Sequence, residues 1–209
     1  MEKLLESFKT LNYLGTQILF FIEVYETYTN NTDYLNKIQF KGHYSNLPFA
    51  KAISGSLLNY SLIICNSFID EYNDEFSVFK HPEHADRILR VKKITKPVMK
   101  RLSKWKNFKD YRNYILAHSF RVDGKSFFSK DFEPFHFNAP HTNSEIVLVA
   151  ELIKIITTCI ALEFPELVEQ LDWKENLLTK MTFNHIEVDI NNELTEVWTQ
   201  IDSIKASIA

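Results

Sequence analysis

Glycine and proline are scarce in this 209-residue sequence, which contains only 4 Gly and 6 Pro. A β-sandwich needs many tight turns, and turns draw heavily on these two residues, so the composition argues against that class and favours long helices. The glycines are isolated from one another, which excludes a glycine-rich phosphate loop. The segment Ser54-Gly55-Ser56 lacks the second glycine of a serine-hydrolase elbow, so that site is excluded as well.

Cysteine and long apolar runs are also scarce. Cys65 and Cys159 each lie in an apolar run of helical character, which predicts buried thiols in a reducing compartment rather than a disulfide framework. The longest apolar runs fall far short of the roughly 20 residues that span a bilayer. Glu2 and Glu6 interrupt the apolar start of the chain, which therefore lacks the core of a signal peptide. The sequence predicts a soluble, cytoplasmic protein with no membrane partner.

Helical spacing is the main pattern that is present. Apolar residues recur at steps of three and four over residues 3–29 and 49–77, which predicts two long helices. Further helices are predicted at residues 83–94, 96–105, 108–119, 144–163, 166–180 and from 191 to about 207. The candidate helix caps are Asn107, Asn143 or Ser144, and Asn191.

Two stretches are predicted not to be helical. Residues 120–142 contain Val122-Asp123-Gly124-Lys125, a hairpin turn signal, and residues 184–190 alternate apolar and polar side chains like a short strand. The predicted fold is all-α, an up-and-down helical bundle with a small irregular or hairpin insertion. We expect residues 1–164 to form the bundle and residues 165–209 to form a C-terminal helical extension packed on it.

Charge is distributed unevenly along the chain. Residues 87–112 hold eleven Lys or Arg and one acid, a local balance of +10, so the rest of the chain carries −13 of the net charge of −3. Such a concentration in an acidic protein is typical of a site for a polyanion. The alternative is a solvated helix face whose cations pair with acids elsewhere in the fold. The sequence leaves both open.

Metal sites find little support in the sequence. His81, Glu83, His84 and Asp86 gather around a proline, but a zinc or di-iron site needs three or four converging ligands. The single Glu-x-x-His, from Glu133 to His136, is predicted to lie in a loop, whereas helical di-iron sites use two such pairs on facing helices. We therefore expect neither a metal nor another cofactor.

One run combines the residues that metal-free phosphodiester cleavage needs. Arg112 and Asn113 are followed by four residues and then His118, near the end of the predicted helix. A histidine can take a proton from a ribose 2′-hydroxyl or give one to the leaving oxygen, because its pKa lies near neutrality. An arginine can stabilise the charge of the phosphorane-like transition state. On an ideal helix the two side chains lie roughly 120° apart, so they could line a cleft that crosses the helix end or is shared with a second copy.

A long all-α chain with Arg-Asn-x4-His at the end of a helix resembles the HEPN family, in particular its abortive-infection and toxin branches. The resemblance covers residues 50–160 best. It implies a bundle of four or five helices, usually a homodimer, with an Arg-x4–6-His motif in the cleft between protomers. It also implies a metal-independent endoribonuclease of toxin or phage-defence type, which cleaves RNA by 2′-hydroxyl attack and has a possible antitoxin.

The resemblance assigns roles to individual residues. Arg112 would grip the scissile phosphate, Asn113 would be the polar residue that follows the arginine, and His118 would be the acid or base. In one toxin branch a tyrosine two residues after the histidine accepts a nucleotide. This chain has Phe120 there, so that mode of regulation is not expected.

Several neighbouring residues complete the candidate site. The RNA-binding residues would come from the basic segment, and Asp70 or Glu71 could place an acid near the motif, although solvated helix-end acids are the alternative. The candidate RNA-binding residues are Lys100, Arg101, Lys104 and Lys109.

Two other functions remain open. The chain could be a non-catalytic HEPN-like module that binds RNA or a nucleotide. It could also be a structural helical protein in which Arg112 pairs with an acid and His118 satisfies the last carbonyls of its helix.

Overall fold

The structure of the protein is a computed structural model. It describes residues 2–30, 39–41, 46–113, 121–122, 125–126, 138–171, 189, 191–192, 194–196 and 198–201. The chain divides into two compact units, Met1–Leu171 and Asp172–Ala209. Among the described helices, none has both the length and the apolar character that crossing a bilayer requires.

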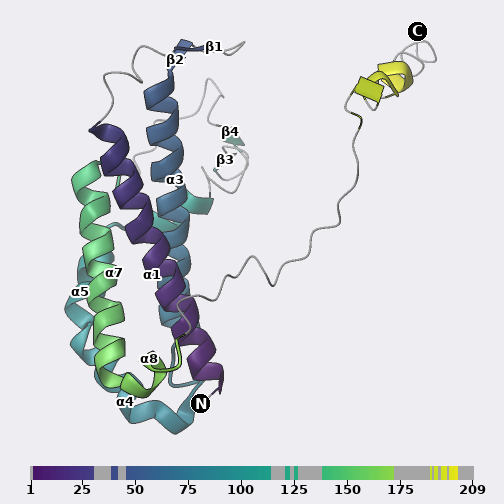
Figure 1. The fold of residues 1–209 in the computed structure, drawn as a ribbon. Coiled ribbons are helices and arrows are strands. Elements are labelled where there is room, and N and C mark those ends of the chain that lie inside the picture. Colours follow the sequence, from purple (N-terminus) through teal and green to yellow (C-terminus); the bar gives the residue numbers. More distant parts are fainter. Residues whose placement is uncertain are drawn as a thin grey trace. The chain divides into compact units, whose positions relative to one another are not determined.

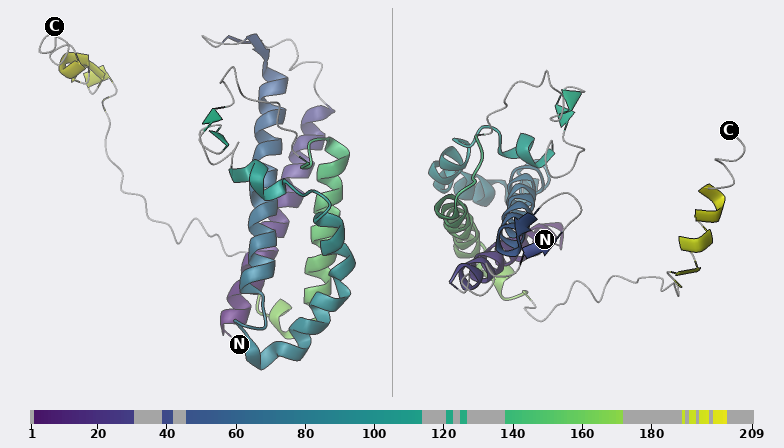
Figure 2. Two further views of the ribbon diagram at one scale, coloured as in Figure 1. Left: turned by 180° about the vertical axis from the view of Figure 1, so that it is seen from behind. Right: turned by 90° about the horizontal axis from the view of Figure 1, so that it is seen from above.

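Three long helices form the first unit, as the sequence predicts. They are α1 (Glu2–Thr29), α3 (Phe49–Asp70) and α7 (Asn143–Glu163). They run side by side, and each contacts the other two (Figures 1 and 2). The predicted all-α helical bundle is therefore confirmed.

Shorter elements complete this unit. α3 continues in a π-helical turn over Glu71–Glu75, and a 3-10 turn over Pro82–His84 leads into the next helix. The remaining helices are α4 (Ala85–Ile94), α5 (Lys96–Leu102), α6 (Phe108–Tyr111) and α8 (Pro165–Val168). Helices α4, α5 and α8 all contact α7, so the basic segment folds against the helix that follows it in the chain.

Two very short antiparallel hairpins accompany the helices. β3 (Arg121–Val122) pairs with β4 (Lys125–Ser126), where the sequence predicts a hairpin turn. β1 (Gln39–Lys41) pairs with β2 (Asn46–Pro48), which the sequence analysis did not predict. Most of the predicted strand at 184–190, and the predicted helical residues 114–119 and 172–180, lie outside the described residues.

The start of α7 is set by a capping box one residue before the predicted caps. Thr142, rather than Asn143 or Ser144, is the N-cap, and its hydroxyl accepts from the backbone N–H of Glu145 at 3.3 Å. The Glu145 carboxylate accepts in return from the backbone N–H of Thr142 at 3.1 Å. Hydrogen bonds from the backbone of His141 and from Thr142 lower the pKa of Glu145 to about 2. Such reciprocal bonds satisfy helix-end donors that would otherwise lack partners.

Asn107 lies at the predicted start of α6, but its side chain does not cap the helix. It donates instead to Asp110 at 3.1 Å and accepts from the backbone N–H of Asn138 at 3.1 Å. The side chain therefore holds the stretch before α7 against the start of α6.

The core lies between the long helices. Its α7 face is a stripe at helical spacing, and each fully buried apolar side chain stabilises the fold by about 1.5–3 kcal/mol. The stripe consists of Ile146, Val149, Ile153, Ile156 and Ile160. It packs with buried side chains of α1 and α3, including Phe8 and Phe68. Both cysteines are free, and burial raises the pKa of Cys65.

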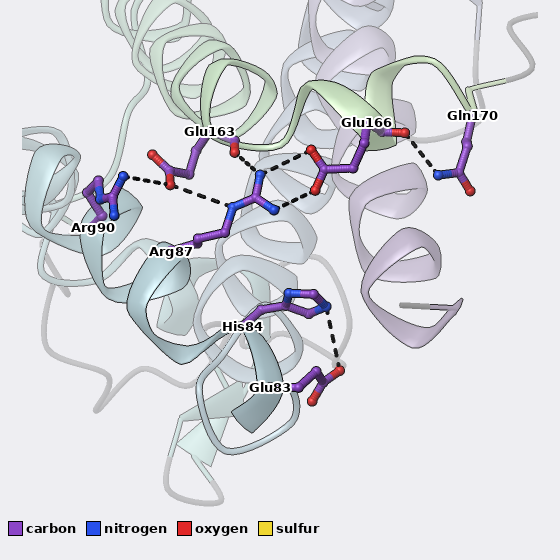
Figure 3. A network of polar contacts seen from close by, with 7 residues as sticks. All are labelled: Glu83, His84, Arg87, Arg90, Glu163, Glu166 and Gln170. Carbon is purple, nitrogen blue, oxygen red and sulfur yellow. Dashed lines mark hydrogen bonds and ion pairs between the residues drawn. The ribbon is translucent and has the colours of Figure 1, made fainter.

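An ion-pair network ties α4 to the junction of α7 and α8 (Figure 3). Arg87 forms a forked contact with Glu166, with nitrogen–oxygen distances of 2.5 and 3.1 Å. It also donates to the backbone carbonyl of Glu163. Its guanidinium lies 4.0 Å from the ring centre of Phe164. Arg90 adds a single contact with Glu163 at 3.2 Å.

The first unit extends beyond residue 164, where the sequence analysis ended the bundle. Leu167 of α8 is fully buried in the core, and Leu171 packs against it. Residues 165–171 therefore belong to the first unit, because the Arg87 contact and the buried Leu167 hold α8 in place. The predicted packing of the remaining C-terminal residues on the bundle stays a prediction.

In its described part, at residues 191–192, 194–196 and 198–201, the second unit is helical. Asp189, rather than the predicted Asn191, caps this stretch, since the Asp189 carboxylate accepts from the backbone N–H of Asn192 at 3.1 Å. The hydroxyl of Thr195 donates to the carbonyl of Asn191 at 2.7 Å, as expected one turn into a helix.

Replacing Arg87 should destabilise the bundle far more than replacing Arg90. Arg87→Ala leaves Glu166 unpaired and removes the forked contact, so we expect a loss of about 2–3 kcal/mol in the free energy of unfolding. Arg90 makes one contact from a side chain that is 61% exposed, so Arg90→Ala should cost less than about 1 kcal/mol. Urea unfolding followed by circular dichroism measures both. Equal losses for the two variants would contradict the role given to Arg87.

Candidate functional site

Helix α6 carries the candidate site, and two contacts with α3 hold it in place. Phe108 is buried, and its backbone carbonyl accepts from the side-chain amide of Asn66 at 3.5 Å. The hydroxyl of Tyr111 donates to Asn59 at 3.5 Å, and burial raises the pKa of Tyr111. Arg112 and Asn113 follow at once in a π-helical turn. Their position relative to α3 is therefore set by the packing of α6.

Asp70, the last residue of α3, lies between two cations of the basic segment. One of its carboxylate oxygens is 3.0 Å from Nη1 of Arg112, and the other is 3.6 Å from Nζ of Lys109. Nε of Arg112 donates to the side-chain oxygen of Asn113 at 3.2 Å. One carboxylate thus offsets one of two positive charges, and the group keeps a formal charge of about +1.

These contacts fix the Arg112 guanidinium without using all of its donors. Its side chain is 24% exposed, against 63% for Lys109. Asp70 and Asn113 occupy Nη1 and Nε, and within the described residues Nη2 has no protein partner. An arginine has five N–H donors in a rigid fork, so the Nη2 edge can still bind a phosphate oxygen.

Of the two candidate acids, only Asp70 lies beside Arg112. The Glu71 carboxylate contacts α1 instead, where it accepts a hydrogen bond of 2.7 Å from the hydroxyl of Ser7. Burial raises the pKa of Glu71. His118 lies outside the described residues, so the pairing of Arg112 with His118 stays a prediction from the sequence.

The basic segment divides into paired ends and an unpaired middle. Arg87 and Arg90 pair with acids of α7 and α8, and Lys109 and Arg112 pair with Asp70. The middle cations form no ion pair with any residue that the structure describes. They are Lys93, Lys96, Lys100, Arg101, Lys104 and Lys106, and we call them the central cations.

Lys92 is the exception within the middle of the segment. Its ammonium group lies 3.4 Å from the ring centre of Tyr72 and donates to the backbone carbonyl of that residue. Burial lowers the pKa of Lys92 to about 8. This lysine holds α4 against the end of α3 and is not part of the central cations.

A cavity of about 510 Å³ opens between the end of α5 and the start of α7. Two central cations, Arg101 and Lys104, line it together with Trp105, His141 and Glu145. The Arg101 guanidinium lies 4.2 Å from the ring centre of Trp105, a cation–π contact. The Glu145 carboxylate is engaged by the capping box, and Trp105 donates to it at 3.4 Å. Arg101 and Lys104 therefore supply the positive charge that would face a ligand, beside the polar side chain of His141.

The four predicted RNA-binding residues do not all lie together. Lys100 and Arg101 are on α5, Lys104 follows it, and Lys109 is on α6 beside Asp70. Trp105 and His141 were not among the site residues predicted from the sequence. No local signal could have found the cavity, because its two walls are more than 30 residues apart in the sequence and only folding joins them.

No group of three His, Cys, Asp or Glu side chains suited to a metal ion occurs in the described part of the chain. His81 is buried, and desolvation lowers its pKa. The ring of His84 packs edge-on against Phe164, with ring centres 6.2 Å apart. Both histidines thus contribute to packing around the 3-10 turn.

Comparison with protein-family models, curated proteins and solved structures finds no match to this chain. The resemblance to the HEPN family therefore rests on the residues of the chain itself.

Removing the charge of Asp70 should strengthen polyanion binding. In Asp70→Asn, Arg112 and Lys109 lose their shared anion, so we expect affinity for a short single-stranded RNA to rise about 3- to 10-fold at low salt. The slope of log K against log salt should steepen by roughly 0.7. Fluorescence anisotropy at several salt concentrations measures both quantities.

Asp86→Asn provides the matched control, because this exposed acid of α4 gives the same change in net charge. If both variants bind RNA equally, the position of Asp70 beside Arg112 has no bearing on binding.

Proposed function

We propose that this chain is a HEPN-like, metal-independent endoribonuclease of toxin or phage-defence type. The observation that carries the proposal is the guanidinium of Arg112, which Asp70 and Asn113 orient while its Nη2 edge stays without a described protein partner. An oriented, permanently charged donor is what the transition state of phosphodiester cleavage requires.

In the proposed reaction the ribose 2′-oxygen attacks the adjacent phosphorus, and the bond to the 5′-oxygen of the next nucleotide breaks. His118 either accepts the 2′-hydroxyl proton while water protonates the leaving 5′-oxygen, or protonates the leaving 5′-oxygen while water accepts the 2′-hydroxyl proton. Arg112 binds the non-bridging oxygens, where negative charge accumulates. Asp70 acts as a positioning residue for Arg112. The products are a 2′,3′-cyclic phosphate and a 5′-hydroxyl end, and no metal takes part.

The central cations supply the affinity for RNA in this proposal. Each phosphate that a cation neutralises releases counterions, and the gain is independent of base sequence. If all six bind phosphates, log K for single-stranded RNA should fall with log salt with a slope of roughly −4. Cations already held in ion pairs, such as Arg87, would contribute little.

The proposal includes the partners that the resemblance implies. The protein would form a two-fold homodimer with Arg112 and His118 of both copies near the axis. An antitoxin would act by binding rather than by modifying a tyrosine, because Phe120 has no hydroxyl.

A second candidate is a non-catalytic module that binds RNA or a nucleotide. The ion pair of Asp70 with Arg112 favours it, because the same pair offsets charge that a catalytic arginine would direct at the phosphate. The depression beside Trp105 favours it as well, because Arg101 and Lys104 line it and could bind the phosphates of RNA or of a nucleotide.

Loss of His118 should abolish cleavage and leave RNA binding intact. We expect His118→Ala to lower the cleavage rate by about 10²- to 10⁴-fold in the presence of a chelator. Arg112→Ala should do the same, and His141→Ala, on the exposed rim of the cavity, is the control. Growth and RNA integrity in bacteria that express each variant, with analysis of the RNA ends, are the measurements. Identical RNA patterns for wild type and His118→Ala would remove the nuclease and leave the binding module.

Charge reversal at the central cations should abolish RNA binding. The variant Lys100→Glu/Arg101→Glu/Lys104→Glu removes three cations and adds three anions, so we expect at least a 100-fold loss of affinity at low salt. The matched control, Lys3→Glu/Lys80→Glu/Lys154→Glu, changes net charge equally outside the basic segment. Anisotropy with labelled RNA measures both variants. Equal losses would show that net charge alone governs binding, and no binding by the wild type would leave the structural alternative.

A further inference from the structure

A polar pocket lies where the first turns of α1 meet the π-helical turn that follows α3. Ser7 of α1 and His81, which follows the π-helical turn, line it and are buried, with exposed fractions of 5% and 3%. Glu71 of the π-helical turn lines it as well and is half-buried. The pocket shares no residue with the candidate site around Arg112 or with the cavity beside Trp105.

The carboxylate of Glu71 forms no ion pair with any residue that the structure describes. Its Oε1 accepts a hydrogen bond of 2.7 Å from the hydroxyl of Ser7, which leaves Oε2 without a partner in that part of the chain. Burial raises the pKa of Glu71, the bond from Ser7 opposes this shift, and the charge of Glu75 adds to it. A partly desolvated carboxylate near a like charge is stabilised by a cation within hydrogen-bond reach.

A second acceptor belongs to the same pocket. Nδ1 of His81 is buried and forms no hydrogen bond with the described residues. Desolvation lowers the pKa of His81, so the imidazole is neutral at pH 7 and has one nitrogen that accepts a hydrogen bond. Buried polar atoms without a partner are uncommon in native folds, where a bound group or an ordered water normally satisfies them.

The other charges of the pocket favour a cation over an anion. Glu75 pairs with Lys80 at 3.4 Å, and both side chains are about half exposed. Glu6 and Lys3, at the exposed edge of the pocket, form no ion pair within the described part of the chain. Three carboxylates therefore stand against two ammonium groups, which leaves a formal charge of −1 when His81 is neutral.

A protonated amine fits these groups better than a metal ion does. Nowhere in the described residues are three His, Cys, Asp or Glu side chains placed to hold a metal. An ammonium group has three N–H donors and no acceptor. Oε2 of Glu71, the accepting nitrogen of His81 and the hydroxyl oxygen of Ser7 supply three acceptors in one pocket.

We propose that this pocket binds the ammonium group of a small aliphatic amine, with Glu71 as its counter-ion and with His81 and Ser7 as neutral acceptors. Glu6 offers a second carboxylate at the edge of the pocket, so a short diamine should bind more tightly than a monoamine. The site is independent of the proposed nuclease, because it makes no use of Arg112.

The first test titrates the full chain with putrescine, n-butylamine and 1,4-butanediol by calorimetry. Putrescine should bind with a Kd below about 1 mM, and the uncharged diol should not bind. Glu71→Gln keeps an oxygen that accepts from Ser7 but removes the charge, so affinity for putrescine should fall about 10- to 100-fold. Glu23→Gln, at an exposed acid of α1 outside the pocket, changes net charge equally and should bind like the wild type.

Three outcomes overturn the proposal: a wild type that does not bind putrescine, equal affinities of wild type and Glu71→Gln, and equal losses in Glu71→Gln and Glu23→Gln. Circular dichroism checks that each variant folds. If Glu71→Gln does not fold, the preference of the wild type for putrescine over 1,4-butanediol decides the matter together with His81→Phe. That variant removes the accepting nitrogen from a ring of similar shape and should weaken binding about 2- to 10-fold.

A second titration distinguishes a cation site from an anion site. Lys3→Gln removes an ammonium group that competes with the ligand, so affinity for putrescine should stay equal or rise. Inorganic phosphate is the opposite probe and should not bind to the pocket. Phosphate binding that Lys3→Gln abolishes, in a protein that does not bind putrescine, would assign the pocket to an anion and contradict the proposal.

Discussion

The bundle depends on one apolar face, the stripe of α7 between Ile146 and Ile160. Helices α1, α3, α4, α5 and α8 all contact α7, so the burial of this stripe positions most of the described fold. Hydrophobic burial is non-directional and does not by itself fix the ends of helices. Here polar contacts fix the ends of α7. The capping box at Thr142 sets where α7 begins, and the ion pair of Arg87 with Glu166 binds α4 to the region where α7 ends.

The same packing sorts the basic segment into two classes of cation. In the sequence the cations of residues 87–112 form one run. In the fold, Arg87 at one end of the run forms an ion pair with Glu166, and Arg112 at the other end forms one with Asp70. The interpretation as paired helix-face cations therefore holds for the two ends of the run, whereas its middle keeps its charge and the polyanion site stays a prediction. The middle cations can bind a polyanion without competition from a paired acid, and this is why the proposed RNA surface centres on α5.

Local chemistry predicted the helices well and their contacts poorly. Helical periodicity placed α1 and α7 within one residue of their observed ends, but the predicted helix 49–77 extends seven residues beyond the end of α3 at Asp70, over the π-helical turn of Glu71–Glu75. Asp123-Gly124 marked the hairpin of β3 and β4. The cap of α7 was misplaced because Thr142, Asn143 and Ser144 are all good capping residues. Asp70 and Glu71 could not be told apart either. The side chains of adjacent helix residues point about 100° apart around the helix axis. The packing of α6 against α3 therefore decides which of the two acids pairs with Arg112.

The sequence by itself determined the all-α class, the approximate positions of the three long helices and the concentration of positive charge. These features depend on residues that are close together in the chain. The tertiary structure alone decided which cations are paired, which acid holds Arg112 and where a cavity opens beside Trp105. The reason is geometric: an ion pair or a cavity wall needs atoms from distant segments within a few ångströms, and packing of the whole bundle sets those distances.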